Sequence, residues 1–431
     1  MLKVLSSKLG KRLVIVSISF VSVNDYTYAE SNSYFNDFIS KFEVGMRTRY
    51  QSVNDNLLGD ASAFTTRMSV TANFSLADSW QLSIQPNYVY AFNKGDYNSV
   101  TVKQYTSPIP DPQGLNLNKI FLDYSSNNDW KVRLGRQKLA FDNERMVGAI
   151  EIWQTPQHFD AIKFDYNDQI NWHVQYVYAN KVHRIFGRNS TSALVKNDVR
   201  YGIFSQRPAD ELGKHKLSAH LINVAYKTEN DLSLVGYGYL LENADQALFS
   251  SNTIGVRIND EMKPTRIKYS YSVEFALQQA AYNNPRDYQT WYSLFEASAQ
   301  YKSHIFKLSQ EVFSEDNVQG FTTPLGTNHK FQGWADVFTS YSTQKGLRDQ
   351  YFTYRGRYKK IRWKMVYHNF INYQNSNKIG NEFDLELAYR ADRKWEFKLV
   401  FANYKTKNES QSFQKENNDL STWFASVSYN I

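Results

Sequence analysis

Cysteine is absent from this chain of 431 residues, and proline occurs only 9 times. The fold therefore cannot depend on the disulfides that small exported domains often need. Long apolar runs are also missing, since the longest, Leu13 to Val23, has eleven residues that include three serines. A membrane-spanning helix needs roughly 20 apolar residues. This shortage, with a mean hydropathy of −0.57, excludes a polytopic helical membrane protein.

Aromatic residues are abundant: 9 Trp, 31 Tyr and 28 Phe make up 16 % of the chain. Hydrophobic residues reach 42 %, which excludes intrinsic disorder. Length alone allows roughly two or three soluble domains or one large all-β domain. A chain that is polar on average, rich in Tyr and Phe and free of cysteine is typical of a transmembrane β-barrel, whose aromatic girdles mark the two membrane interfaces.

The first thirty residues have the pattern of a secretory signal peptide. A basic segment precedes the apolar run, and Thr27-Tyr28-Ala29 offers small residues at a cleavage site. We expect residues 1–29 to be the signal peptide and residues 30–431 to be a single outer-membrane β-barrel domain; the alternative is a short buried helix or strand. Removal of 1–29 lowers the net charge from +8 to +5. The basic residues of the leader are Lys3, Lys8, Lys11 and Arg12.

Apolar and polar residues alternate along much of the remaining chain, which predicts half-buried strands. The clearest examples are 80–85, 267–278, 361–368 and 382–390, with Trp or Tyr near the strand ends. The alternation continues from Trp423 to the terminal Ile431. Barrel-insertion machinery commonly recognises such a last strand, although the final residue is usually aromatic. We therefore expect this machinery and outer-membrane lipid among the partners.

Short polar turns and long polar stretches separate the predicted strands. We predict an all-β fold, a transmembrane antiparallel β-barrel of about 18 strands with short periplasmic turns and long extracellular or pore-folded loops. This predicted architecture places the protein in the bacterial outer membrane. The predicted loops are 93–115, 138–158, 180–214, 279–289, 314–346, 371–380 and 405–420.

Basic residues occupy the polar face of several predicted strands, which in a barrel points into the lumen. If neighbouring strands pair, Arg355, Arg357, Arg362 and Lys364 form one basic patch. Lumen arginines concentrate anions and bind carboxylates in a bidentate manner. The alternative is a neutral lattice of ion pairs with lumen acids such as Glu43, Asp123, Asp165, Glu274, Glu296, Glu311, Glu382, Asp384 and Glu386. The candidate pore-lining residues are Arg47, Arg49, Arg67, Arg133, Arg136, Arg145, Arg355, Arg357, Arg362 and Lys364.

One segment, from Leu134 to Phe164, breaks the alternation and reads LGRQKLAFDNERMVGAIEIWQTPQHFDAIKF. A second segment, from Asn328 to Asp349, contains Asn-His-Lys-Phe, Gly-Trp-Ala-Asp-Val-Phe and Gly-Leu-Arg-Asp. Both resemble the alginate export outer-membrane protein family, whose members carry a Gly-Arg-Gln strand end followed by Trp, Gln-Thr-Pro and Phe-Asp. The chain departs from that pattern at Trp153, which is followed directly by Gln154 where members often have a basic residue.

The resemblance implies an 18-stranded barrel whose loops fold inward and whose lumen passes polyuronate. Independently, Arg136 and Arg145 lie beside Asp142, Glu144 and Asp160 in the sequence, so ion pairs are expected to hold a constriction loop. The alternative is an extracellular cap that only stabilises the rim. The candidate constriction residues are Asp142, Glu144, Trp153, Gln154, Asp160, Asp336 and Asp349.

These observations predict a passive outer-membrane channel for anionic sugar polymers or oligomers, of the alginate-like polyuronate class. A general small-solute porin of the same fold is the alternative, and a barrel enzyme is the third hypothesis. None of the eight His lies in a Gly-x-Ser-x-Gly elbow or a His-Glu-x-x-His helix, so we expect no enzyme activity.

We expect no cofactor and no metal. Residues 315–317 resemble a calcium loop only weakly, because the spacing of calcium ligands is missing. The expected soluble partners are anionic polysaccharide or small anionic solutes. Nucleic acid is not expected, because the basic residues alternate through strands instead of clustering on a helix or arm. Whether a periplasmic partner exists stays open at this point.

Overall fold

The computed structural model describes residues 39–126, 129–198, 206–264, 266–338, 346–407 and 415–431. The predicted signal peptide, residues 1–29, lies outside the described residues, so its assignment remains a prediction.

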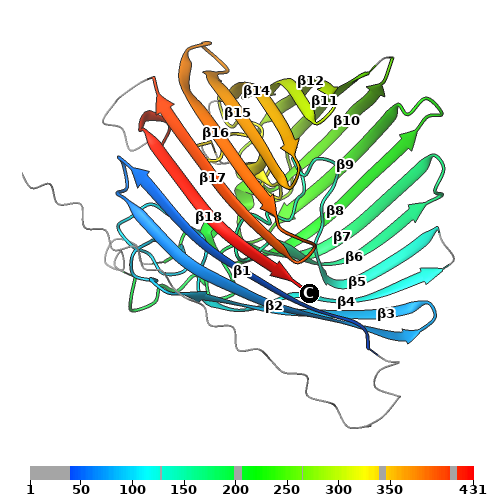
Figure 1. Ribbon diagram of the computed structural model, residues 1–431, viewed down its shortest axis with the longest axis horizontal. Coiled ribbons are helices and arrows are strands. Elements are labelled where there is room, and N and C mark those ends of the chain that lie inside the picture. Colours follow the sequence, from blue (N-terminus) through cyan, green and yellow to red (C-terminus); the bar gives the residue numbers. More distant parts are fainter. Residues whose placement is uncertain (1–38, 127–128, 199–205, 265, 339–345, 408–414) are drawn as a thin grey trace, which may run out of the picture.

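Eighteen antiparallel strands, each paired with its neighbours in sequence, form a closed barrel (Figure 1). β1 closes the barrel by pairing with β18, with Gly45 opposite Asn430. The predicted transmembrane antiparallel barrel is thus confirmed. The strands are β1 (Ile39–Asp55), β2 (Ala61–Ala77), β3 (Trp80–Ala91), β4 (Gly114–Ser126), β5 (Trp130–Gln137), β6 (His158–Asn167), β7 (Trp172–His183), β8 (Lys214–Lys227), β9 (Ser233–Asn243), β10 (Ser251–Met262), β11 (Ile267–Ala280), β12 (Gln289–Tyr301), β13 (His304–Phe313), β14 (Leu347–Tyr358), β15 (Ile361–Asn372), β16 (Lys378–Arg390), β17 (Trp395–Thr406) and β18 (Leu420–Asn430).

The period-two alternation has a direct structural cause, because successive side chains of a strand point to opposite faces. Outward faces carry exposed apolar residues such as Met68, Leu134 and Leu308. Cross-strand aromatic pairs follow the turn side of the barrel, with ring centroids 4.6 to 4.8 Å apart. Such a girdle is typical of a membrane interface. The pairs are Trp80–Tyr124, Trp130–Tyr166, Trp172–Tyr226 and Trp395–Tyr429.

Connections differ in length between the two rims, as predicted. Turns such as 302–303, 359–360 and 391–394 lie on the rim that also holds the end of β18, and in an outer-membrane barrel this rim is periplasmic. The other rim carries the long connections, including 92–113, 138–157, 184–213 and 314–346.

Two loops are shorter than predicted, and two predicted loop residues lie on strands. The loop expected at 180–214 begins later, since β7 continues to His183, and the loop expected at 371–380 shortens to 373–377. Asp160 lies on β6, where a register shift at Asp160 and Ala161 changes the phase of the alternation. Asp349 lies on β14 between Arg348 and Gln350, so polar residues occupy both faces of the strand there. The alternation of apolar and polar residues that would identify the strand is therefore absent at this point.

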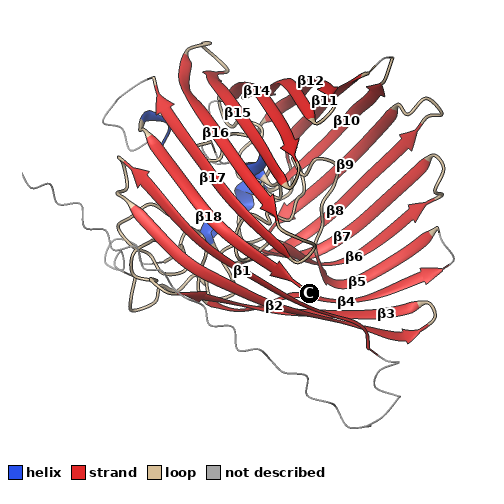
Figure 2. Cartoon of the chain, viewed as in Figure 1, coloured by secondary structure: helices blue, strands red, loops and turns tan. Residues whose placement is uncertain are grey.

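Helical structure in the described part of the chain is limited to short 3-10 turns, drawn in blue in Figure 2. No helix among the described residues is long and apolar enough to span a bilayer. The turns are η1 (Ala209–Glu211), η2 (Ala247–Phe249), η3 (Asn328–Lys330) and η5 (Lys415–Asn417).

Candidate functional site

The connection between β5 and β6, residues 138–157, folds into the barrel and is here called the first inward loop. Asp142 accepts a hydrogen bond of 2.8 Å from Asn223 on β8. Arg145 pairs with Glu311 on β13, with a nitrogen–oxygen distance of 3.2 Å. Gln154 accepts a hydrogen bond of 2.9 Å from Arg47 on β1. One loop therefore reaches walls on opposite sides of the lumen.

Left-handed backbone explains why this loop breaks the alternation. Asp142, Glu144 and Ile150 have φ values of 50°, 70° and 50°. Non-glycine residues rarely adopt this conformation, so the surroundings must hold it. Burial raises the pKa of Asp142 above its usual value, although the hydrogen bond from Asn223 opposes that rise. The loop is thus a strained element that its wall contacts keep in place.

The second inward loop, residues 314–346, enters from the connection between β13 and β14; its residues 339–345 lie outside the described part. The backbone N–H of Ala335 donates a 2.6 Å hydrogen bond to Glu382 on β16. Phe338 packs on Phe370 of β15, with ring centroids 4.3 Å apart. Gly333 has φ of +81°, and a Cβ there would lie 2.3 Å from Glu382 Oε2. This loop can approach the wall so closely only with glycine at that position.

The two inward loops are joined to each other in the lumen. Val147 and Leu325 form a parallel β-bridge, and the Gln157 amide donates 2.9 Å hydrogen bonds to the carbonyls of Gly148 and Leu325. Glu144 accepts hydrogen bonds of 2.9 Å from Thr327 and Lys330. Burial by itself would raise the pKa of Glu144, but the hydrogen bonds from Lys330 and Thr327 lower it below its usual value. Together the loops form one constriction.

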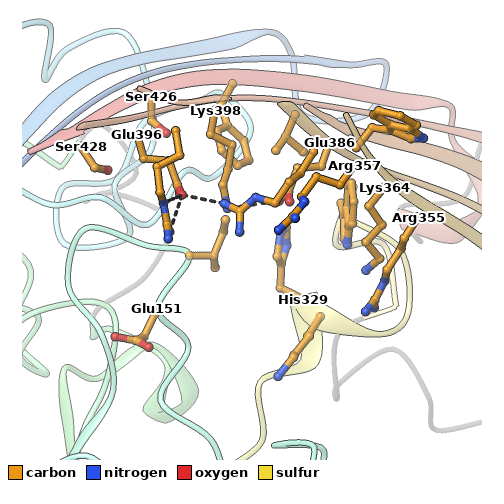
Figure 3. Close-up of a pocket in the computed structure, with 18 of the residues that line it drawn as sticks. Glu151, His329, Arg355, Arg357, Lys364, Glu386, Glu396, Lys398, Ser426 and Ser428 are labelled. Carbon is orange, nitrogen blue, oxygen red and sulfur yellow. Dashed lines mark hydrogen bonds and ion pairs between the residues drawn. The ribbon is translucent and has the colours of Figure 1, made fainter. Parts of the chain in front are cut away.

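A cavity of about 830 Å³ lies between this constriction and the wall formed by β13 to β18 and β1. Its lining includes nine Lys and Arg but only four Glu, so the cavity is strongly cationic. Figure 3 shows Glu151 and His329, from the two loops, on the opposite side of the cavity from Arg355, Arg357 and Lys364. The opening beside the constriction is thus lined by cations of the barrel wall.

The inward cations of β14 to β17 are here called the basic wall: Arg355, Arg357, Arg362, Lys364, Arg390 and Lys398. Register places like charges opposite each other, Arg355 beside Lys364 and Arg357 beside Arg362. The predicted patch therefore exists as a set of neighbours on paired strands.

Acids neutralise only part of the basic wall. Arg362 and Arg390 share Glu396, at 2.7 and 2.8 Å, and Lys398 pairs with Glu386 at 3.1 Å. Arg355, Arg357 and Lys364 form no ion pair within 4.0 Å among the described residues. The Lys364 ammonium lies 4.7 Å from the ring centre of Trp334, at the tip of the second inward loop. Three cations are thus left to act on solutes in the cavity.

Arg47, Arg49 and Arg67 hold the first inward loop. Arg47 donates to the carbonyl of Glu151 at 3.0 Å, and Arg67 to that of Gln154 at 3.5 Å. Arg49 is 2 % exposed, pairs with Asp111 at 3.2 Å and lies between the rings of Trp153 and Phe424. Arg47 and Arg49 still border the cavity. Their main contacts are structural.

Three other predicted pore-lining arginines lie away from the main cavity. Arg133 binds both oxygens of Asp123 at 2.6 and 2.8 Å, which matches the predicted lattice of ion pairs. Arg136 pairs with Asp160 at 2.7 Å, as expected from the sequence, but the pair joins β5 to β6. Arg145 and its partner Glu311 are fully buried.

The predicted constriction residues also divide between the loops and the wall. Trp153 and Gln154 are buried where the first inward loop meets β1 and β2. Asp336, on the second inward loop, lies 2.9 Å from His329. Asp349 is buried on β14 and lies 2.8 Å from His368 of β15. Among the described residues no cluster of three or more His, Asp and Glu is suited to hold a metal ion.

Several residues of the site were missed in the sequence. Arg390, Glu396 and Lys398 lie on inward positions that the alternation of β16 and β17 already marks. Lys330 belongs to the second motif, but nothing local indicates its pairing with Glu144. The strand residues were thus accessible to sequence reasoning, whereas the contacts between loops were not.

A second cavity, of about 480 Å³, lies along β8 to β13 and has a different charge. Its lining has two Lys against four Asp and Glu. The inward cations of these strands, here called the paired wall, all form ion pairs: Lys227 with Asp231, Arg257 with Glu274, Lys268 with Glu261 and Lys307 with Glu296.

Comparison with known proteins gives a family and a fold. The family model described as "Alginate export" matches residues 39–302. OccAB1 of Acinetobacter baumannii superposes with a TM-score of 0.67 at 11 % identity, covering 91 % of this chain and 97 % of its own. Two Pseudomonas aeruginosa structures are similar at 91 % and 99 % coverage: OpdK with vanillate (0.65, 10 %) and OccK2 (OpdF) with glucuronate (0.60, 11 %). No curated protein matches the chain by sequence.

Proposed function

The chain belongs to the alginate export family, and its barrel is that of an outer-membrane porin; from this premise we propose that it is a passive channel for anionic sugars, oligomers or polymers of uronate type. One observation carries the proposal: the main cavity is lined by Arg355, Arg357 and Lys364, which have no ion-pair partner among the described residues. Neutralised cations exert little field at a distance, but unpaired cations raise the local concentration of anions.

The chemistry of the basic wall suits carboxylates in particular. A guanidinium offers a planar set of donors that binds a carboxylate through two hydrogen bonds. Neighbouring cations on β14 and β15 therefore favour a solute that carries several carboxylates. The fold relatives OccK2 and OpdK were solved with glucuronate and vanillate. These carboxylate-bearing ligands support the proposed class of solute for this chain.

A general small-solute porin is the second candidate, and the paired wall favours it. Along β8 to β13 the cations are neutralised and the second cavity is slightly acidic. A solute that passed mainly along this wall would meet no net positive field. The family and fold are those of transport porins, and we propose no enzymatic role. We also propose that residues 1–29 direct export and are removed.

The test is the reversal potential of the refolded protein in a planar bilayer across a KCl gradient. Anion selectivity is expected, and R355A/R357A should lower it severalfold, because two unpaired cations are lost. The matched control is K227A/K268A, which removes the same charge from the paired wall and should change selectivity less. A cation-selective wild type, or equal effects of the two variants, would refute the proposal.

A further inference from the structure

A second group of cations lies on the periplasmic rim, where β14 turns into β15 and β16 into β17. A cavity of about 560 Å³ opens there, here called the turn-side vestibule. Six basic residues and one acidic residue line it. The lining consists of Arg357, Lys359, Lys360, Arg362, Arg390, Ala391, Asp392 and Arg393.

The two acids near the vestibule already have hydrogen-bond or ion-pair partners. Asp392 accepts hydrogen bonds of 2.8 Å from the backbone N–H groups of Lys394 and Trp395, so its carboxylate caps its own turn. Glu396 is shared between Arg362 and Arg390. The Lys360 ammonium donates to the carbonyl of Ala391 and thereby ties the two turns together. The two negative charges of Asp392 and Glu396 thus face the six positive charges of the vestibule.

Four of the six cations have no ion-pair partner within 4.0 Å among the described residues: Arg357, Lys359, Lys360 and Arg393. On the same rim of the paired wall, the exposed Lys227 pairs with Asp231 and Lys268 pairs with Glu261. Lys263 and Lys302, on that side of the rim, also have no ion-pair partner among the described residues, but they lie in two separate turns. The vestibule differs because it gathers its unpaired cations around one cavity.

The vestibule opens toward the lumen. It shares Arg357, Arg362 and Arg390 with the main cavity, so a continuous row of cations leads inward to Lys364. The outward neighbours on the same strand ends are apolar or aromatic, Tyr358 and Ile361, with exposed fractions of 64 % and 45 %. This arrangement suits a soluble polyanion entering the pore better than a lipid headgroup held against the outer surface.

We propose that the turn-side vestibule is a capture site, at which an anionic polysaccharide chain approaching from the periplasm binds before it enters the basic wall. This inference rests on the proposed function of the main cavity. A positively charged mouth accelerates the encounter with an anion by roughly 10- to 1000-fold and does so less at high salt. The vestibule therefore sets the rate of entry from one side, while the basic wall sets selectivity.

The experiment is single-channel recording with a defined uronic acid hexamer added to one side of the bilayer. The chain lacks cysteine, so a single Asp78→Cys change in the turn between β2 and β3 allows biotinylation there, and streptavidin then identifies the turn side of each channel. The test variant is K359E/K360E/R393E. The matched control, K227E/K263E/K302E, reverses three lysines at the turn-side ends of β8, β10 and β12.

We expect the test variant to lower the blocking on-rate from the turn side on the order of tenfold, because electrostatic steering is lost. The on-rate from the loop side should be unchanged, and the turn-side on-rate should depend less on salt concentration. An unchanged open-channel conductance should show that the barrel of the variant is intact. The control should keep the wild-type on-rate. A turn-side on-rate unchanged in the test variant, or lowered equally by the control, would overturn the proposal.

Three outcomes separate this proposal from its premise and from lipid binding. A wild-type channel that is neither anion-selective nor blocked from either side would refute the proposed function itself. An anion-selective channel that is blocked equally well in the test variant would refute only the vestibule. If wild-type block from the turn side disappears when a zwitterionic bilayer is replaced by one rich in phosphatidylglycerol, the vestibule holds lipid headgroups and the proposal is wrong.

Discussion

The basic wall and the paired wall are built on the same alternation yet differ in what faces each inward cation. On β10 and β11, Arg257 lies directly opposite Glu274. On β14 and β15, Arg355 lies opposite Lys364. Opposite charges on paired strands cancel, whereas like charges add their fields. The comparison teaches that cross-strand register decides the local field in the lumen, and that the net charge of the whole chain does not.

Like charges directly opposite each other destabilise a sheet by roughly 0.2–1 kcal/mol per pair. The basic wall carries two such pairs, Arg355 with Lys364 and Arg357 with Arg362. Replacing one cation of each pair by Asp or Glu would neutralise the other. The paired wall contains such acid–base pairs. The basic wall therefore has a field that the paired wall lacks, at a small energetic cost.

The largest expected effect comes from detaching the first inward loop from β13. R145A leaves the fully buried Glu311 without its cation, and breaking such a pair costs about 3–5 kcal/mol. We expect a lower unfolding temperature in detergent and a larger, noisier conductance, as solutes gain access along the paired wall. R136A is the control, because its pair with Asp160 is partly exposed and is expected to contribute only about 0–1 kcal/mol. Equal destabilisation by both variants would contradict this assignment.

The second prediction converts the basic wall into a paired one. K364E places a carboxylate opposite Arg355 on the neighbouring strand. Anion selectivity should fall severalfold, while the free energy of unfolding should change by less than about 1 kcal/mol, because the new attraction to Arg355 is opposed by repulsion from Glu386, which lies opposite position 364 on β16. K364Q separates the two effects, since it removes the charge without creating a pair. Reversal potentials and urea unfolding measure the outcome, and unchanged selectivity in K364E would show that this patch does not act on permeating ions.

The third prediction is an increase in anion selectivity, produced by a substitution on the paired wall. E296Q removes the partner of Lys307 at the second cavity and leaves that lysine uncompensated. We expect anion selectivity to rise, but by less than about twofold, because a single charge is freed in a polar lumen that screens it. E43Q, at the exposed end of β1, is the control and should have no effect on the reversal potential. A fall in anion selectivity would contradict the account.

The smallest expected effect concerns the link between the inward loops. The pKa of Glu144 is lowered in the folded state by the hydrogen bonds from Lys330 and Thr327, against the effect of burial. Its contribution to stability is therefore present above the pKa of the unfolded chain and is lost as pH falls through the lower folded value. Current fluctuations should increase when the pH is lowered below about 4. E144Q should show increased fluctuations already at neutral pH and little further change on acidification.

Local pattern was sufficient to predict the barrel. A strand's inward and outward faces follow from a period of two, and antiparallel neighbours joined by a two-residue turn have only one plausible partner strand. Arg357 and Arg362 flank such a turn, so their pairing was predictable from the sequence. Pattern failed at Asp160, where a register shift changes the phase, and at Asp349, where polar residues occupy both faces.

The sequence by itself thus determined the fold class, the family motifs and the charges that each strand presents to the lumen. Only the tertiary structure decided which of these charges remain free. Arg145 contacts Glu311, which is 166 residues away in the sequence, and Gln154 contacts Arg47, which is 107 residues away. The loops that cross the lumen make both contacts. Such contacts depend on closure of the barrel, which brings distant walls within reach of one loop. No local periodicity encodes them, because they are set by the curvature of the sheet and the path of the chain across its interior.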